Sequence, residues 1–134
     1  MKTVKAIIER SADGHFSIYM DDNSLPYLVT GTGKTVAEAR AVFMGGYEDM
    51  KRIFTEDGNE FEEVTFEFHY DMASFLQFFA YALTLAGLER ITGVNQRQLS
   101  HYINGTSKPS KQTTKKIEEG LHSFANEITA VKFV

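Results

Sequence analysis

The chain has 134 residues, which suits one ordinary domain or two small ones. It contains no cysteine, so disulfides and thiolate metal sites are excluded. A short apolar run near the N-terminus ends at Glu9 and Arg10, and no later run is long enough to span a bilayer. We therefore expect a soluble, cytoplasmic protein with no membrane segment.

The charge is unevenly divided along the chain. Residues 1–70 hold 7 Lys and Arg against 13 Asp and Glu, a net charge of −6, whereas residues 71–134 hold 7 against 5, a net charge of +2. The acidic N-terminal part and the mildly basic C-terminal part predict two modules that contact different partners.

The first thirty residues predict three strands of a meander. Residues 4–9 are rich in β-branched side chains, and residues 16–20 alternate between apolar and polar types. The Asp13-Gly14 pair between them is typical of a hairpin turn. A third short strand is predicted at residues 27–30.

A break at residues 31–35, Gly-Thr-Gly-Lys-Thr, precedes a predicted helix. A phosphate-binding loop would need a glycine where Leu28 stands, so nucleotide hydrolysis is disfavoured. Thr35 and Glu38 have the spacing of a capping box, and residues 61–70 then alternate as a fourth strand. The predicted fold class is α+β: a small antiparallel sheet with one helix, in the order βββαβ, followed by an all-α domain.

No group of residues has the pattern of a catalytic or metal site. The histidines lack the i, i+4 and His-x-Glu spacings of a zinc site. The carboxylates near the strands fall in turns or caps, as Asp13 and Glu38 do, and no Ser/His/Asp arrangement is evident. The sequence therefore predicts no enzymatic activity, no metal and no cofactor.

Residues 88–105, LERITGVNQRQLSHYING, predict two short helices joined by a tight turn. Gly93 stands where a left-handed C-terminal cap is needed, and Asn95 is suited to cap the second helix. Leu99 and Ile103 repeat at helical spacing on the inner face.

Polar side chains on the outer face of the second helix suit a DNA groove. Four of them are predicted to face bases: Gln96, Arg97, Ser100 and His101. Three that follow suit phosphate contacts, which position a protein without specifying sequence: Asn104, Thr106 and Lys108.

Residues 93–105 resemble the turn and recognition helix of Cro/repressor-type (XRE-type) helix-turn-helix domains. The Gly-Val pair, the mid-helix Leu-Ser pair and the closing Asn-Gly pair fall at matching intervals, and the likeness runs from about residue 84 to residue 126. It implies binding to double-stranded operator DNA, with Thr84 contacting phosphate at the start of the first helix. The alternative is an ordinary packed helical hairpin.

Residues 1–70 resemble the N-terminal domain of the HicB antitoxin family, a partial RNase H-like fold. The likeness lies in residues 4–9, residues 13–16, the loop around Pro26 and residues 30–39, where Gly-x-Thr-x-x-Glu-Ala enters the helix. It implies an antitoxin. Residues 1–70 would bind a small basic HicA-like ribonuclease toxin, and residues 71–134 would form the DNA-binding helix-turn-helix domain that represses the operon.

One reading helix of this size rarely binds tightly alone, so a homodimer or higher homo-oligomer on a palindromic operator is expected. Two other functions stay open. One is a stand-alone transcriptional repressor whose N-terminal domain dimerises or senses a ligand. The other is a protein-binding module whose helix-turn-helix does not touch DNA. The tail at residues 128–134 predicts either a frayed helix end or a short strand that completes a partner's sheet.

Overall fold

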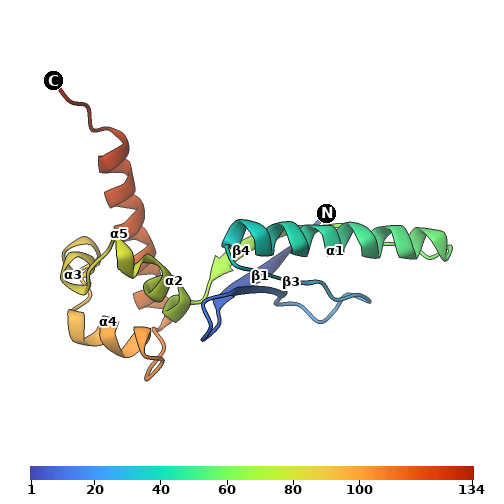
Figure 1. Ribbon diagram of the computed structural model, residues 1–134, viewed down its shortest axis with the longest axis horizontal. Helices are drawn as coiled ribbons and strands as arrows, with labels where there is room; N and C mark the ends of the chain where they lie inside the picture. Colours follow the sequence, from blue (N-terminus) through green and yellow to red (C-terminus); the bar gives the residue numbers. More distant parts are fainter. The chain divides into compact units, whose positions relative to one another are not determined.

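Four strands and one long helix make up the N-terminal part of the protein (Figure 1). The computed structural model describes residues 1–134. The elements follow one another as β1 (Lys2–Arg10), β2 (Phe16–Met20), β3 (Thr30–Gly33), α1 (Val36–Glu56) and β4 (Val64–Tyr70). The predicted α+β class and the order of three strands, a helix and a strand are confirmed.

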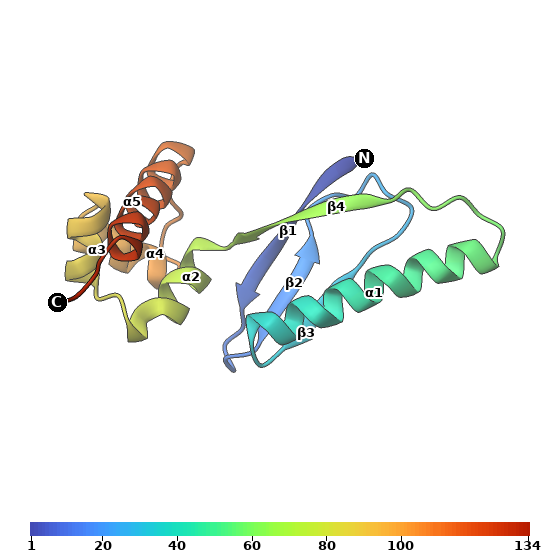
Figure 2. The same cartoon turned by 90° about the horizontal axis from the view of Figure 1, so that it is seen from above.

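The sheet is mixed, whereas the sequence predicted an antiparallel one. Its strand order is β3-β2-β1-β4, and β1 pairs antiparallel with β2 but parallel with β4, so that Val4 lies opposite Phe66. A parallel neighbour requires a long crossover connection, and the 21-residue helix α1 supplies it between β3 and β4. Figure 2 shows β1 between β2 and β4.

The third strand lies at Thr30–Gly33, not at the predicted residues 27–30. The glycines that indicated a break are needed because α1 packs directly against this strand. A Cβ on Gly31 would lie 2.4 Å from the Ala39 carbonyl oxygen, and one on Gly33 would lie 2.6 Å from the Ala39 nitrogen. Glycine inside a strand is typical of such close backbone approach.

The core of this part lies between α1 and one face of the sheet. Its buried side chains alternate along the strands and repeat along the helix: Val4, Ala6, Ile8, Phe16, Ile18, Met20, Ala39, Phe43 and Tyr47. Within this unit no helix covers the opposite face, where Tyr19 Oη donates to Glu9 Oε1 at 2.8 Å. Burial raises the pKa of Tyr19 to about 12, and the bond to Glu9 adds to the shift.

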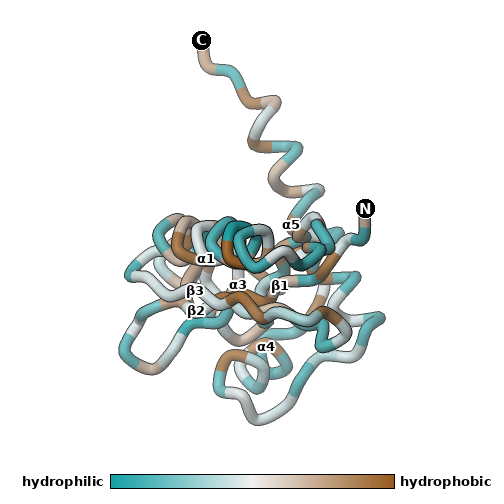
Figure 3. Tube along the Cα trace, turned by 90° about the vertical axis from the view of Figure 1, so that its right-hand side faces the viewer, coloured by the Kyte–Doolittle hydropathy of each residue, from teal (hydrophilic) through white to brown (hydrophobic).

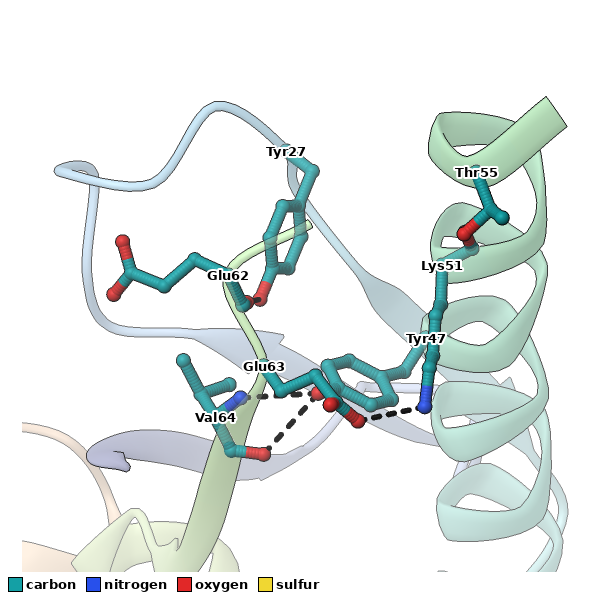
Figure 4. A network of polar contacts seen from close by, with 7 residues as sticks. All are labelled: Tyr27, Tyr47, Lys51, Thr55, Glu62, Glu63 and Val64. Atoms are coloured by element: carbon teal, nitrogen blue, oxygen red, sulfur yellow. Dashed lines mark hydrogen bonds and ion pairs between the residues drawn. The ribbon is translucent and has the colours of Figure 1, made fainter. Parts of the chain in front are cut away.

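Polar contacts fasten the segment before β4 to α1 and to the loop after β2 (Figure 4). The Tyr47 hydroxyl accepts from Val64 N at 3.0 Å and donates to Val64 O at 3.3 Å. The Tyr27 hydroxyl donates to the Glu62 carbonyl at 2.7 Å, and the two tyrosine rings lie edge to face at 6.3 Å. The start of β4 is thereby held by side chains from outside the sheet.

The rest of the chain is helical. Its elements are α2 (Met72–Phe78), the 3₁₀ turn η1 (Phe79–Tyr81), α3 (Leu85–Thr92), α4 (Gln96–Ile103) and α5 (Lys111–Thr129). The structure divides into two compact units, Met1–Ser74 and Phe75–Val134. The tail after Thr129 forms neither helix nor strand within the chain.

No single helix is both long enough and apolar enough to cross a membrane. The segment Met72–Tyr81 meets those limits only when joined to Leu85–Thr92, from which it is bent by 119°.

Replacing Tyr47 with Phe removes the partner of the buried Val64 N–H. Because a buried donor left unpaired costs about 1–3 kcal/mol, we expect the free energy of unfolding of the N-terminal unit to fall by that amount. Urea titration and amide hydrogen exchange at Val64, followed by NMR, measure the effect. Tyr81→Phe is the control, since Tyr81 is 80% exposed and its hydroxyl makes no hydrogen bond. Equal protection of Val64 in both variants would contradict the assignment.

Candidate nucleic-acid interface

The turn between α3 and α4 fixes the direction of α4 relative to α3. Gly93 caps α3 in the left-handed conformation, with φ of 77°, and its N–H donates to the Glu89 carbonyl at 2.8 Å. Asn95 caps α4, because its side-chain oxygen accepts from Gln98 N at 2.8 Å. Both predicted caps are confirmed. They satisfy backbone groups that a helix end otherwise leaves unpaired, so the turn holds one geometry.

The inner side of the two helices is closely packed. Leu99 and Tyr102 of α4 are buried, as are Leu88 of α3 and Val94 of the turn. The buried Thr92 hydroxyl donates to the Leu88 carbonyl at 2.7 Å and accepts from Val94 N at 3.1 Å. The Thr92 hydroxyl inside this core is therefore hydrogen-bonded as donor and as acceptor. One face of α4 is buried in the same core.

The outer side of α4 is open. Gln96, Arg97 and His101 are exposed, and Ser100 is half-buried. Arg97, His101 and Asn104 follow at intervals of four and three residues, which places them on one side of the helix. The side chains of Arg97 and His101 make no hydrogen bond or ion pair within the chain, so their donors are available to a ligand. The structure thus brings the four residues predicted to face bases together on one surface.

The residues predicted to contact phosphate lie at helix ends and in the loop after α4. The Thr84 hydroxyl caps α3 by accepting from Gly87 N at 3.0 Å, which leaves its hydrogen free to donate. Asn104 is the C-terminal cap of α4, and Thr106 and Lys108 are exposed in the following loop. The Thr106 N–H donates to the His101 carbonyl at 2.9 Å, which folds the loop back on the end of α4.

Three polar side chains that the sequence analysis did not single out also shape this surface. Glu89 Oε1 accepts from Gln96 N at 2.9 Å and so gives α4 a second N-terminal cap. Lys116 Nζ donates to the Gly93 carbonyl at 3.3 Å, and Gln98 donates to the Tyr102 hydroxyl at 2.7 Å. The seven-residue interval between Glu89 and Gln96 spans a helix end and a turn, so no helical periodicity indicates the contact.

The charge of this unit suits a polyanion. Residues 75–134 hold 7 Lys and Arg against 4 Asp and Glu, a net charge of +3. Four lysines lie within residues 108–116, close in sequence to the end of α4. Glu89 is the one acid before residue 118 in this unit, and its carboxylate is engaged at the α4 cap. A local basic surface attracts phosphates even on a chain whose net charge is −4.

Residues 80–123 match a family model described as helix-turn-helix, which covers about a third of the chain and includes α3, α4 and about the first two thirds of α5. Neither a curated protein nor a solved structure matches the chain. The C-terminal unit therefore contains a helix-turn-helix domain, the kind of domain by which regulators of transcription bind DNA. The predicted C-terminal helix-turn-helix is confirmed, and the individual DNA contacts remain predictions.

The contact of Glu89 with the start of α4 predicts different effects for two substitutions. Glu89→Ala removes the acceptor and is expected to lower the free energy of unfolding by about 1 kcal/mol, as loss of a helix cap does. Glu89→Gln keeps an acceptor oxygen and should retain most of that stability. Glu118→Ala, at an exposed position of α5, controls for loss of a surface carboxylate. Urea unfolding measures all three, and equal midpoints for the two Glu89 variants would show that the cap is unimportant.

Proposed function

We propose that the chain is the antitoxin of a HicA/HicB-type toxin–antitoxin pair, which neutralises a small ribonuclease toxin and represses its own operon. The observation that carries this proposal is the order of two units of unlike charge. An acidic β-β-β-α-β unit comes first, and a helix-turn-helix unit of net positive charge follows it. This order and the likeness of residues 1–70 to the HicB family support the assignment of toxin binding to residues 1–70 and of DNA binding to residues 71–134.

In this proposal α4 enters the major groove of operator DNA. Gln96, Arg97 and His101 face base edges, with Ser100 between them. An arginine can donate two hydrogen bonds to one guanine, which makes Arg97 the strongest candidate for sequence readout. Phosphate contacts come from residues that flank α4 in space or in sequence: Thr84, Asn104, Thr106 and Lys108. A homodimer, or a higher homo-oligomer, presents two copies of α4 to a palindromic site in the cytoplasm.

The acidic unit is suited to hold a basic ribonuclease. Residues 1–74 carry 7 Lys and Arg against 14 Asp and Glu. Six of the acids fall within twelve residues around the end of α1 and the start of β4, and all six are exposed: Glu56, Asp57, Glu60, Glu62, Glu63 and Glu67. A ribonuclease must offer a basic surface to RNA phosphates, and carboxylates compete for that surface.

Two substitutions separate base readout from phosphate contact. Arg97→Ala is expected to relax sequence preference by roughly 1–3 kcal/mol at the position that it reads. Lys108→Ala should weaken binding to all duplexes alike and lower the salt slope by about 1. Titrations of duplexes from upstream of the gene, at several salt concentrations, measure both effects. Lys34→Ala removes the same charge from an exposed site in the N-terminal unit and should change neither. If Arg97→Ala and Lys108→Ala weaken every sequence equally, α4 does not read bases.

The toxin contact is tested by looking for a gene for a small basic protein directly beside this one and expressing that protein with the chain. Co-expression should yield a stable complex in which RNA cleavage by that protein is suppressed. Reversing two acids, Glu60→Lys with Glu62→Lys, should slow association, most of all at low salt, because it weakens electrostatic steering. Glu118→Lys with Glu119→Lys makes the same charge change in the other unit and is the control. A neighbouring protein that does not bind the chain would leave the stand-alone repressor as the better account.

A further inference from the structure

The two edge strands of the sheet, β3 and β4, differ in how open they are to a further strand. β3 has four residues, two of which are glycine, and so short a strand is a poor template for pairing. β4 has seven residues without proline or lysine, and it pairs in continuous register with β1 on one side only (Figure 2). Native sheets usually blunt or cover such an edge.

Half of the backbone groups of β4 point to its open side. The N–H of Asp71 donates to a carbonyl of β1 at 2.9 Å, so the odd-numbered residues of this strand bond inward and the even-numbered ones point outward. At Val64 the Tyr47 hydroxyl pairs both outward groups, as donor and as acceptor. No group of the chain pairs the outward N–H and C=O of Phe66 and Phe68. These groups are what an added strand bonds to.

The core is also incomplete along this edge. Val4 and Ala6 of β1, which lie opposite Phe66 and Phe68, are 1% and 0% exposed, whereas the two phenylalanines are half-buried. Both rings contact Phe43 of α1, with centroids 4.8 and 5.7 Å apart. Side chains at matching positions of neighbouring strands lie on the same face, so apolar residues of an added strand would cover the exposed part of both rings.

The tail of the chain has the pattern of such a strand. Its last four residues are Val-Lys-Phe-Val, in which β-branched and aromatic side chains predominate. Phe133 is 94% exposed, and Val131 alone has a backbone hydrogen bond, to the Ile128 carbonyl at the end of α5. In Figure 3 the stretch next to the label C shows a hydrophilic residue between hydrophobic ones. The tail is thus a strand-forming sequence that joins no sheet within its own chain.

We propose that residues 131–134 of one copy add to the open edge of β4 in a second copy as a fifth strand, with Lys132 opposite Glu67. The occupant is a second copy because the sheet of a single chain has four strands and its own tail joins none of them. Glu67 is exposed and pairs only with His69, at 2.6 Å, and Lys132 has no ion pair. Unlike charges on directly opposite residues stabilise the pairing of two strands.

The same alignment brings the apolar side chains together. Because side chains alternate with a period of two on both strands, Val131 and Phe133 lie beside the two phenylalanines of β4 on the core face, whichever direction the added strand runs. A shift by one residue would place Lys132 on the core face, so the pattern specifies the register. Reciprocal exchange of tails closes the pair and leaves neither β4 edge open. This inference goes beyond the proposed function and does not rest on it.

Amide hydrogen exchange of the full chain at high micromolar concentration, followed by NMR, tests the added strand. The N–H groups of Phe66 and Phe68 are expected to exchange roughly tenfold or more slowly in the full chain than in a chain that ends at Ala130. The Asp71 N–H is the internal control, because its bond to β1 does not involve the open edge. Equal exchange of Phe66 and Phe68 in the two chains would overturn the proposal.

Charge reversal tests the register. Glu67→Lys is expected to weaken association of two copies by roughly 2- to 30-fold, because a reciprocal exchange loses two cross-strand pairs. Adding Lys132→Glu to Glu67→Lys should restore the affinity, since the pair is rebuilt with opposite signs. Glu60→Lys makes the same charge change outside β4 and is the control. Sedimentation equilibrium measures all three. A double variant that associates no more tightly than Glu67→Lys alone would contradict the alignment.

Cross-linking identifies which copy supplies the tail. Because the chain has no cysteine, single cysteines can be introduced cleanly. Glu67→Cys mixed with Lys132→Cys should give a disulfide-linked dimer on oxidation, whereas Glu60→Cys mixed with Lys132→Cys should not. In a chain that carries both Glu67→Cys and Lys132→Cys, a link within one chain would show that the tail fills its own sheet. That result, or the absence of any link, would overturn the proposal, and neither outcome depends on a toxin or on DNA.

Discussion

The direction in which α4 points depends on a three-residue turn. Gly93 adopts a backbone conformation that other residues take only at a cost of roughly 1–2 kcal/mol, and Asn95 starts α4 two residues later. The turn is closed from both sides, by Glu89 at the α4 terminus and by Lys116 on the Gly93 carbonyl. Side chains from two other helices thus hold the start of α4, and the polar surface that it presents is set before any ligand arrives.

The structural features that were predicted correctly from the sequence mostly depend on neighbouring residues. The caps at Thr35, Gly93 and Asn95 depend on residues within a few positions of each other, and all three are present. The predictions that were wrong concern features that depend on contacts between residues far apart in the chain. Gly31 suggested a break because the sequence alone does not show that α1 lies against that strand, and the parallel direction of β4 depends on where α1 returns the chain. The Glu89 contact escaped notice for the same reason, since it joins two helices across a turn.

The acidic residues are placed differently in the two units. In the helix-turn-helix unit the acids are placed where they do not face a polyanion: Glu89 is engaged at a helix end, and the other three lie beyond Gly120 or directly before it on α5. In the N-terminal unit the acids are exposed near the end of α1, where Lys51 pairs with Glu63 at 2.6 Å and Arg52 pairs with Glu56 at 3.4 Å. Asp57, Glu60 and Glu62 make no ion pair there. One chain therefore carries a net positive unit that suits nucleic acid and an acidic unit of opposite charge.

Gly120 is the residue at which α5 packs against α3. Because no side chain stands between α5 and α3 at this residue, the axis of α5 is fixed closely against the helix that carries the turn. A rigid helix transmits this placement along its length, so whatever contacts the exposed second half of α5 also sets the position of α4.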